Sequence, residues 1–214
     1  QCSAPYECGF LAHCQSAEPQ AEHHVRWLPR RSQALKAHIE EHGISELRDV
    51  PDDLLNPTQQ RVKAATLSGQ AFFDQPATAQ ALAAHKLPGY FIDFETIQFG
   101  VPLWKGTRPY QQLPFQFSVH RLGRTGRATH QAFLDLSGGN PSLAFAQSLV
   151  AACGERGPVF VYNAAFETTR IRELAERHPR LATALRAIND RVVDLLPIAR
   201  QHYYHPSQQG SWSI

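Results

Sequence analysis

Asp93 and Glu95 lie two positions apart within the segment 89–96, Gly-Tyr-Phe-Ile-Asp-Phe-Glu-Thr. Aromatic and β-branched residues that follow Pro88 and a glycine are typical of a buried strand after a turn. Because side chains alternate between the two faces of a strand, we expect both carboxylates on the same face. Two neighbouring negative charges beside an apolar core favour a divalent cation with oxygen ligands, Mg²⁺ or Mn²⁺ rather than Zn²⁺. The alternative is that both acids occupy the solvated end of an ordinary strand.

A second set of polar residues follows another apolar strand, which we predict over residues 158–162. Asn163 and Glu167 come directly after it, where we expect a helix to begin and run through Arg177. Ligands of open α/β sheets bind at the carboxyl edge of the strands, so both side chains are candidate site residues. The simpler alternatives are that Asn163 is the N-cap of the helix and that Glu167 interacts favourably with the helix dipole.

Three of the four cysteines, Cys2, Cys8 and Cys14, fall within the first 14 residues. A secreted disulfide framework does not suit a chain that otherwise resembles an intracellular protein, so this spacing favours a thiolate-bound centre. The alternative is three thiols without a ligand. Cys153 is isolated within a predicted helix, and we expect it to be a small buried apolar residue.

The elements that position these residues change in kind along the chain. Residues 25–88 carry helical patterns and predict a small all-α connector. From residue 89 the pattern is that of strands joined by turns and helices. The predicted helices are 32–42, 58–67, 78–85, 141–152, 163–177 and 179–188, and the predicted strands are 89–96, 115–121, 129–136 and 158–162. Residues 192–204 predict a short strand or turn and then a last helix.

This order of elements predicts an α/β fold. A three-stranded meander followed by a helical crossover to another strand is the arrangement of an RNase H-like mixed sheet with flanking helices. We therefore expect three parts: a Cys-rich segment over 1–24, a helical connector over 25–88 and the sheet domain over 89–214.

Composition sets wider bounds on the function. With 43% hydrophobic and 19% charged residues, the 214-residue chain has the balance of an ordinary soluble globular protein. A net charge of +2 permits a nucleic-acid partner without arguing for one. No apolar run is long enough to cross a membrane and no signal peptide opens the chain, so we expect a cytoplasmic protein without a membrane partner. The chain starts at Gln1 and contains no methionine, and we interpret it as a fragment of a longer protein.

The two acidic segments resemble the motifs of the DnaQ-like, or DEDD, family of 3′→5′ exonucleases. That family's first motif, Asp-x-Glu on the first strand, matches Asp93 and Glu95. Its second motif, Asn-x-x-Phe-Asp at a helix start, matches residues 163–167, with Glu167 in place of the usual Asp. Residues 194–200 resemble the family's Asp-Thr-Leu-x-x-Ala-Arg stretch, in which the acid has a supporting role. The third motif, a Tyr or His a few residues before a last Asp, has no match before Ile214.

This resemblance implies two-metal-ion hydrolysis of phosphodiester bonds in DNA or RNA, with Mg²⁺ or Mn²⁺. Asp93 would bridge both ions, Glu95 would help hold the ion that activates water, and Glu167 would complete the coordination. Supporting positions would be Asn163 and Asp194. The residues that would contact nucleic acid are Thr96 and, on the turn between the second and third strands, Arg124 and Arg127; the alternative for the two arginines is a solvated surface.

The whole chain more closely resembles an uncharacterised bacterial family that joins a RecB-like nuclease region to a DnaQ-like domain. The early cysteines resemble those that bind an iron–sulfur cluster in RecB-like nucleases; zinc, with His13, His23 or His24 as fourth ligand, is the second possibility. Residues 210–214 resemble that family's Gly-Ser-x-Ser-Ile-Lys stretch. The resemblance implies a Tyr-x-x-x-Asp third motif outside this chain, a C-terminally incomplete domain over 89–214 and an upstream nuclease domain as partner.

Two functions other than that of a nuclease are also compatible with the sequence. Glu167 in place of Asp and the missing third motif are both compatible with a catalytically inactive module that binds nucleic acid. A structural connector to the upstream nuclease, with the helical segment as its interface, is the other alternative.

Overall fold

The computed structural model describes residues 8–16 and 21–214. The chain forms two compact units, Gln1–Phe73 with Arg200–Ile214, and Asp74–Ala199, which we call the helical unit and the sheet unit. From the sequence we grouped residues 200–214 with the sheet and began the sheet domain at residue 89. The tail belongs to the helical unit because β7 (Tyr203–Tyr204) pairs antiparallel with β1 (Phe72–Phe73).

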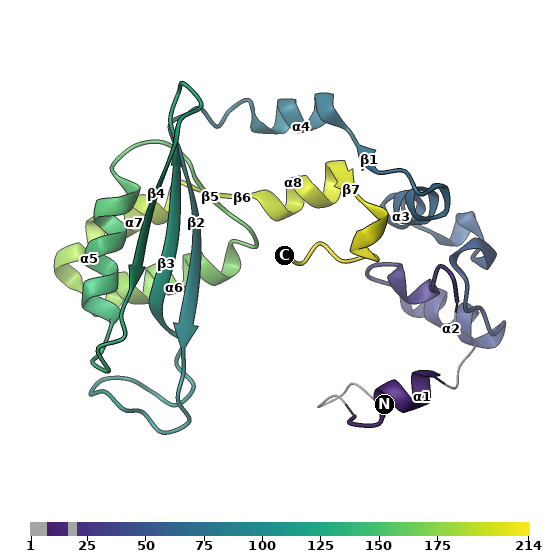
Figure 1. The fold of residues 1–214 in the computed structure, drawn as a ribbon, viewed down its shortest axis with the longest axis horizontal. Coiled ribbons are helices and arrows are strands. Elements are labelled where there is room, and N and C mark those ends of the chain that lie inside the picture. The colour runs from purple at the N-terminus through teal and green to yellow at the C-terminus, as the bar shows by residue number, and fades with distance from the viewer. Residues whose placement is uncertain (1–7, 17–20) are drawn as a thin grey trace. The chain divides into compact units, whose positions relative to one another are not determined.

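The sheet unit contains a five-stranded mixed sheet with the strand order β4-β3-β2-β5-β6 (Figure 1). The strands are β2 (Gly89–Ile97), β3 (Leu113–Leu122), β4 (Ala128–Leu134), β5 (Val159–Val161) and β6 (Val192–Asp194). Strands β2, β3 and β4 form an antiparallel meander, whereas β5 runs parallel to β2, and β6 parallel to β5. The predicted mixed α/β architecture with flanking helices is confirmed.

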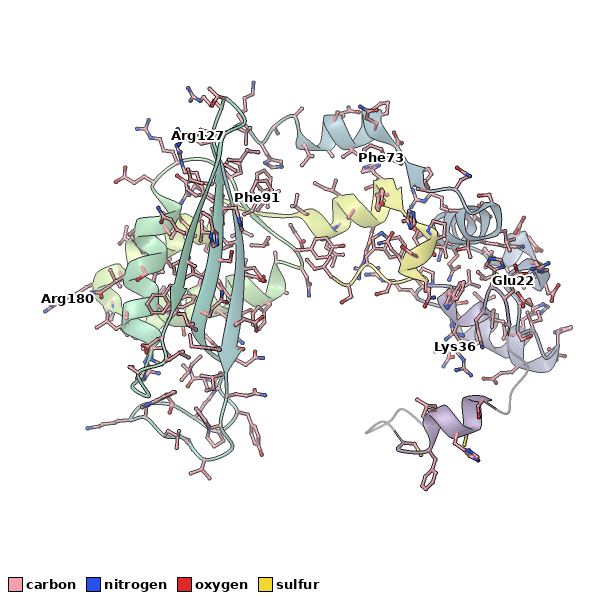
Figure 2. The ribbon with its side chains drawn as sticks, viewed as in Figure 1. Glu22, Lys36, Phe73, Phe91, Arg127 and Arg180 are labelled. Carbon is pink, nitrogen blue, oxygen red and sulfur yellow. The ribbon has the colours of Figure 1, made fainter. Side chains whose placement is uncertain are left out.

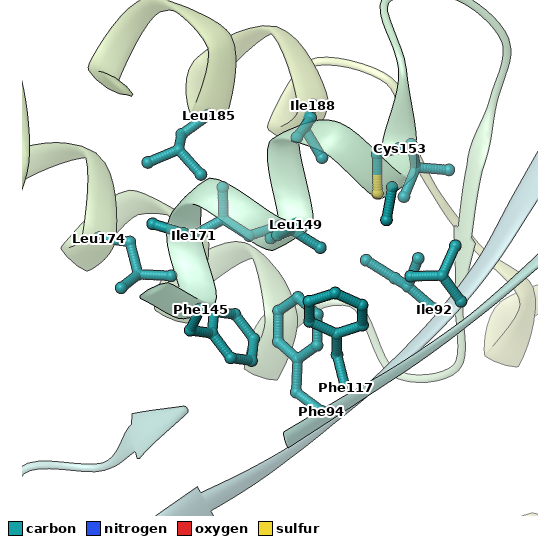
Figure 3. Close-up of a cluster of buried hydrophobic side chains, with 14 of the residues drawn as sticks. Ile92, Phe94, Phe117, Phe145, Leu149, Cys153, Ile171, Leu174, Leu185 and Ile188 are labelled. Atoms are coloured by element: carbon teal, nitrogen blue, oxygen red, sulfur yellow. The ribbon is translucent and has the colours of Figure 1, made fainter. Parts of the chain in front are cut away.

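One face of this sheet is covered by helices α5 (Ser142–Cys153), α6 (Ala165–Arg177) and α7 (Ala182–Asn189) (Figure 1). Apolar residues of these helices meet those of β2, β3 and β5 in a single core (Figure 3). The alternation along β2 assigns its faces: Ile92 and Phe94 are buried in the core, whereas Phe91, Asp93 and Glu95 are exposed. The face of the sheet that carries the two acids is therefore the one opposite the core.

Two further helical segments belong to this unit. The 3-10 turn η4 (Pro179–Leu181) lies between α6 and α7, and α4 (Gln75–Leu82) precedes the sheet. Helix α4 begins before its predicted start at residue 78, because the Asp74 side chain accepts a hydrogen bond from the Ala77 amide at 3.0 Å and caps the helix there. In the described ranges, no helix is long and apolar enough to cross a membrane.

The helical unit has a smaller core of its own. Its helices are α1 (Leu11–Ser16), α2 (Gln33–Glu41) and α3 (Pro57–Ser68), and α8 (Leu195–His202) leads into it from the sheet unit. Its 3-10 turns are η1 (Val25–Trp27), η2 (Leu47–Asp49), η3 (Asp52–Leu54) and η5 (Pro206–Gln208). The returning tail is buried through Tyr204, whose hydroxyl lies 3.1 Å from Thr66 Oγ1 and accepts a hydrogen bond from the Gly210 amide.

Candidate metal centre

Strand β2 presents Asp93 and Glu95 on its exposed face, with Phe94, only 3% exposed, between them on the opposite face. The expectation that the two carboxylates share a face is confirmed. Asp93 pairs with Ser118 and Glu95 with Gln116 of β3, and the register then shifts between Glu95 and Thr96. Such irregularities re-aim side chains at sheet edges and beside functional sites. Thr96 is partly buried just beyond the shift.

Glu167 lies in the first turn of α6 and is 4% exposed, although a carboxylate in a first helical turn is usually solvated. Its Oε2 is buried without a hydrogen-bond partner among residues 8–16 and 21–214. Burial, with smaller contributions from the charges of Asp93 and Asp194, raises the pKa of Glu167 to about 7, against the effect of a hydrogen bond from its own backbone amide. The structure therefore brings Glu167 within electrostatic reach of Asp93, although the two residues come from different elements.

Register explains why Asp93 and Glu167 come within electrostatic reach of each other. Phe91 pairs with Phe160 in the parallel β2–β5 ladder, so Asp93, two residues on, is level with the end of β5. Helix α6 begins just after that strand end. Parallel strands carry their ligand-binding groups at this carboxyl edge.

Asp194 at the end of β6 holds the turn from which α6 starts. Its Oδ1 accepts hydrogen bonds from the amides of Asn163 (3.0 Å) and Leu196 (2.9 Å), and its Oδ2 accepts one from the Ala164 amide (3.0 Å). The alternative assignment of Asn163 as the helix N-cap is wrong: Ala164 is the cap residue, and Asn163 has a φ of 74°. A left-handed asparagine is tolerated where hydrogen bonds hold it, and the Asp194 carboxylate satisfies the amides that a capping side chain would bind. The supporting role expected for Asp194 thus has a geometric basis.

The raised pKa of Glu167 makes a prediction about stability. Between pH 4.5 and about 7 the folded protein holds a proton that the unfolded chain releases. The stabilising contribution of this carboxyl is therefore full below pH 4.5 and is lost as the pH rises through about 7. In EDTA above pH 7, we expect Glu167→Gln to raise the free energy of unfolding by about 1–2 kcal/mol, after allowance for solvent screening.

Urea denaturation of both proteins above pH 7 and below pH 4.5 measures this effect, because the difference should vanish in acid, where the wild-type carboxyl is neutral. Glu176→Gln on the exposed side of the same helix is the matched control and should change stability at neither pH. A difference of equal size at both pH values would show that Glu167 acts through packing and not through its charge.

The donor set fits a hard cation. In the part of the chain that the structure describes, no three His, Cys, Asp or Glu side chains converge into a group able to hold a metal ion by themselves. Mg²⁺, however, is commonly held by one or two carboxylates, with water and substrate phosphates as the remaining ligands. The unpartnered Glu167 oxygen beside the Asp93 charge is the kind of acceptor that such a cation satisfies. Asp93, Glu95 and Glu167 are the residues that would hold it.

Of the three cysteines in the predicted N-terminal centre, the structure describes Cys8 and Cys14, whereas Cys2 lies outside the described residues. Cys8 is partly buried and Cys14 is exposed on α1, both as free thiols. His24, one of the histidines predicted as a fourth zinc ligand, caps η1: its Nδ1 accepts a hydrogen bond from the Arg26 amide. The iron–sulfur or zinc centre stays a prediction. Cys153, by contrast, is fully buried in the sheet-unit core, as expected, and burial raises the pKa of its thiol to about 12.

Two of the three predicted nucleic-acid contacts, Arg124 and Arg127, lie at the other end of the sheet, whereas Thr96 directly follows Glu95. Arg124 and Arg127 belong to the β3–β4 hairpin and are exposed. Arg124 Nε donates a hydrogen bond to the Leu87 carbonyl at 3.2 Å, so this side chain also ties the hairpin to the segment before β2. Arg121 pairs with Tyr90, one position before Phe91, which places the hairpin ahead of the carboxylates along β2.

Comparison with known proteins assigns a family without a function. No curated protein and no solved structure matches the chain significantly. A family model described as a domain of unknown function (DUF2779) matches residues 90–213, which include both acidic segments and Asp194. Because the match spans more than half of the sequence, the chain belongs to the DUF2779 family.

Proposed function

We propose that this protein is a metal-dependent nuclease that hydrolyses phosphodiester bonds of DNA or RNA from the 3′ end, with Mg²⁺ or Mn²⁺. The observation that carries the proposal is Glu167 on α6, whose Oε2 is buried without a hydrogen-bond partner among the described residues and whose pKa is raised by burial and, to a smaller extent, by the charge of Asp93 on β2. The charge of Asp194 adds a smaller contribution of its own to this pKa, and carboxyls with strongly shifted pKa values are typical of functional sites.

The topology supports the same assignment. The strand order β4-β3-β2-β5-β6, with three antiparallel strands followed by two that run parallel to β2, suits an RNase H-like sheet. The acids lie on its central strand and at the start of the helix that follows the neighbouring parallel strand. We include the DnaQ-like assignment, a cytoplasmic location and an upstream nuclease domain of the same protein in this proposal.

The roles of the residues follow from their positions. Asp93 and Glu95, exposed on one strand face, can contact cation and substrate together, whereas the buried Glu167 approaches from the helix side. Bound cations would supply positive charge for the phosphate oxygens on which negative charge develops and would activate the attacking water. Cation binding requires the charged form of Glu167, so it would release the proton that this carboxyl holds near neutral pH. Asp194 keeps the start of α6 in place through its three amide hydrogen bonds.

A second candidate function is a catalytically inactive module that binds nucleic acid. The observation that favours it is the pKa of Glu167 near 7, which leaves this carboxyl partly neutral at physiological pH. A neutral carboxylic acid can donate a hydrogen bond to a phosphate oxygen without a cation.

Digestion of end-labelled oligonucleotides by the full-length protein separates the two functions. With Mn²⁺ or Mg²⁺ we expect a 5′-labelled single strand to shorten stepwise and a 3′-labelled strand to lose its label at once, and EDTA should abolish both. Binding without degradation, on DNA and RNA alike, would support the inactive module. Degradation that persists in EDTA would contradict a metal-dependent nuclease.

A further inference from the structure

A row of aromatic rings crosses the sheet on the same face as the two carboxylates. Phe160, Phe91, His120 and His130 are direct neighbours in the ladders of β5, β2, β3 and β4, so all four lie at one level. The Phe160 and Phe91 rings stack with centroids 4.8 Å apart, and the His120 and His130 rings stack at 4.3 Å. We call these four residues the aromatic row.

Most of the row is open to solvent. Phe91 is 37% exposed, and His120 and His130 are exposed, whereas Phe160 is only 5% exposed. The His85 ring contacts Phe160 edge-on at a centroid distance of 6.0 Å and helps to cover it. Within each stacked pair a ring has one face covered by its partner, so the other face is the one that can stack on a base, and rings held on a rigid sheet offer that face at low entropic cost.

The row continues directly into the candidate metal centre. Asp93 follows Phe91 by two residues on the same face, a distance of about 7 Å, which equals the rise of about two stacked nucleotides. The cross-strand neighbour of Asp93 is Ser118, whose Oγ lies 3.0 Å from Nε2 of His130. On this face of the sheet, the pair Asp93 and Ser118 therefore lies between the aromatic row and the pair Glu95 and Gln116.

Charge is distributed to match a nucleic-acid strand. Beyond the row, on the side away from the acids, lies the hairpin with the exposed Arg121 and Arg127, and Figure 2 shows Phe91 and Arg127 in the same half of the sheet. Basic side chains attract phosphates, aromatic faces stack on bases, and the carboxylates take the cations that phosphates also bind. An apolar protein helix would instead require a continuous apolar surface, which Asp93, Ser118 and the two histidines interrupt.

We infer that the aromatic row is a stacking platform for unpaired nucleobases, which makes the substrate a single-stranded end of DNA or RNA. This inference rests on the proposed function in one respect: the bound strand is taken to run from the platform toward Asp93 and Glu95, where it would be cut. Double-stranded nucleic acid does not fit, since its bases are already stacked on one another and present no free face.

The test is equilibrium binding, measured in EDTA so that no cleavage occurs, with the full-length protein. The probes are fluorescein-labelled oligothymidylate and oligouridylate, and strands of equal length whose sugars carry no bases. Phe91→Leu keeps apolar bulk against Phe160 but removes the ring, and His120→Gln keeps a polar side chain without one. Leu143→Ala truncates an exposed side chain on α5, outside the proposed surface, and is the matched control.

We expect wild type to prefer strands with bases, and each ring variant to bind them about tenfold more weakly while binding abasic strands as wild type does. The control should bind every probe like wild type. Equal affinity of wild type for strands with and without bases, equal weakening of both by the ring variants, or no binding to any strand would overturn the inference. Thermal unfolding of each variant establishes that it is folded.

Failure of this inference can be told apart from failure of the proposed nuclease. If base-dependent binding requires the row but the full-length protein cuts no strand in Mn²⁺, the platform stands and the nuclease fails. If the protein cuts but its binding ignores the bases, the nuclease stands and the platform fails.

Discussion

Asp93→Asn is expected to lower the rate of phosphodiester hydrolysis by about 10³-fold or more. The substitution keeps the size of the side chain and removes a charge that is exposed on β2 and that contributes to the raised pKa of Glu167. The negative charge that develops on the phosphate would then lose its main stabiliser. Stability in EDTA should be unchanged or slightly higher, because the charge of Asp93 disfavours the ionised form of Glu167.

The measurement is digestion of a labelled oligonucleotide with Mn²⁺ by wild-type and Asp93→Asn full-length protein, with any upstream nuclease site disabled in both. Glu155→Gln, an exposed acid between α5 and β5, is the control and should cut at the wild-type rate. Equal degradation by wild type and Asp93→Asn would mean that this site is not the catalyst.

Phe145→Ala is expected to lower the free energy of unfolding by about 3–5 kcal/mol, the usual cost of emptying a large aromatic site in a core. Phe145 is fully buried on α5, and Figure 3 shows it beside Phe94 and Phe117. Its ring lies edge-on to those of Phe94, Phe117 and Phe133 at centroid distances of 5.1, 5.3 and 5.8 Å. It therefore joins the helical layer to all three strands of the meander.

Leu143→Ala is a matched control from the same helix, since Leu143 is 48% exposed and its truncation should cost less than about 0.5 kcal/mol. Urea denaturation of the three proteins, followed by tryptophan fluorescence and circular dichroism, gives both values. Similar losses from both substitutions would show that α5 does not pack on the sheet through Phe145.

Local sequence pattern was sufficient for most elements. The aromatic and β-branched run around Asp93 and Glu95 predicts β2, and the helix predicted over 58–67 lies within α3, where Asn56 and Gln59 form both halves of a capping box. These features depend on neighbours in the chain, and so a single sequence can reveal them.

The parts of the site that depend on distant residues were not predictable in the same way. The hydrogen bonds that the amides of Asn163 and Ala164 donate to Asp194 span 31 and 30 positions, so local pattern does not reveal that Asp194, and not the Asn163 side chain, binds these amides. Glu167 has the position of a solvated first-turn acid, and its burial follows only from how α6 packs against the sheet. The aromatic row needs the registers of three ladders, none of which the sequence states.

The helical unit is assembled from two separated stretches, whereas the sheet unit is one continuous stretch, residues 74–199. A ribosome that makes the chain therefore delivers the whole sheet unit before residues 200–214 exist, and domains generally fold as they emerge. Until then Thr66 lacks its Tyr204 hydroxyl partner, and β1 lacks the strand that pairs with it. A chain truncated after residue 199 would thus contain every residue of the carboxylate and aromatic surfaces but lack the second stretch of the helical unit.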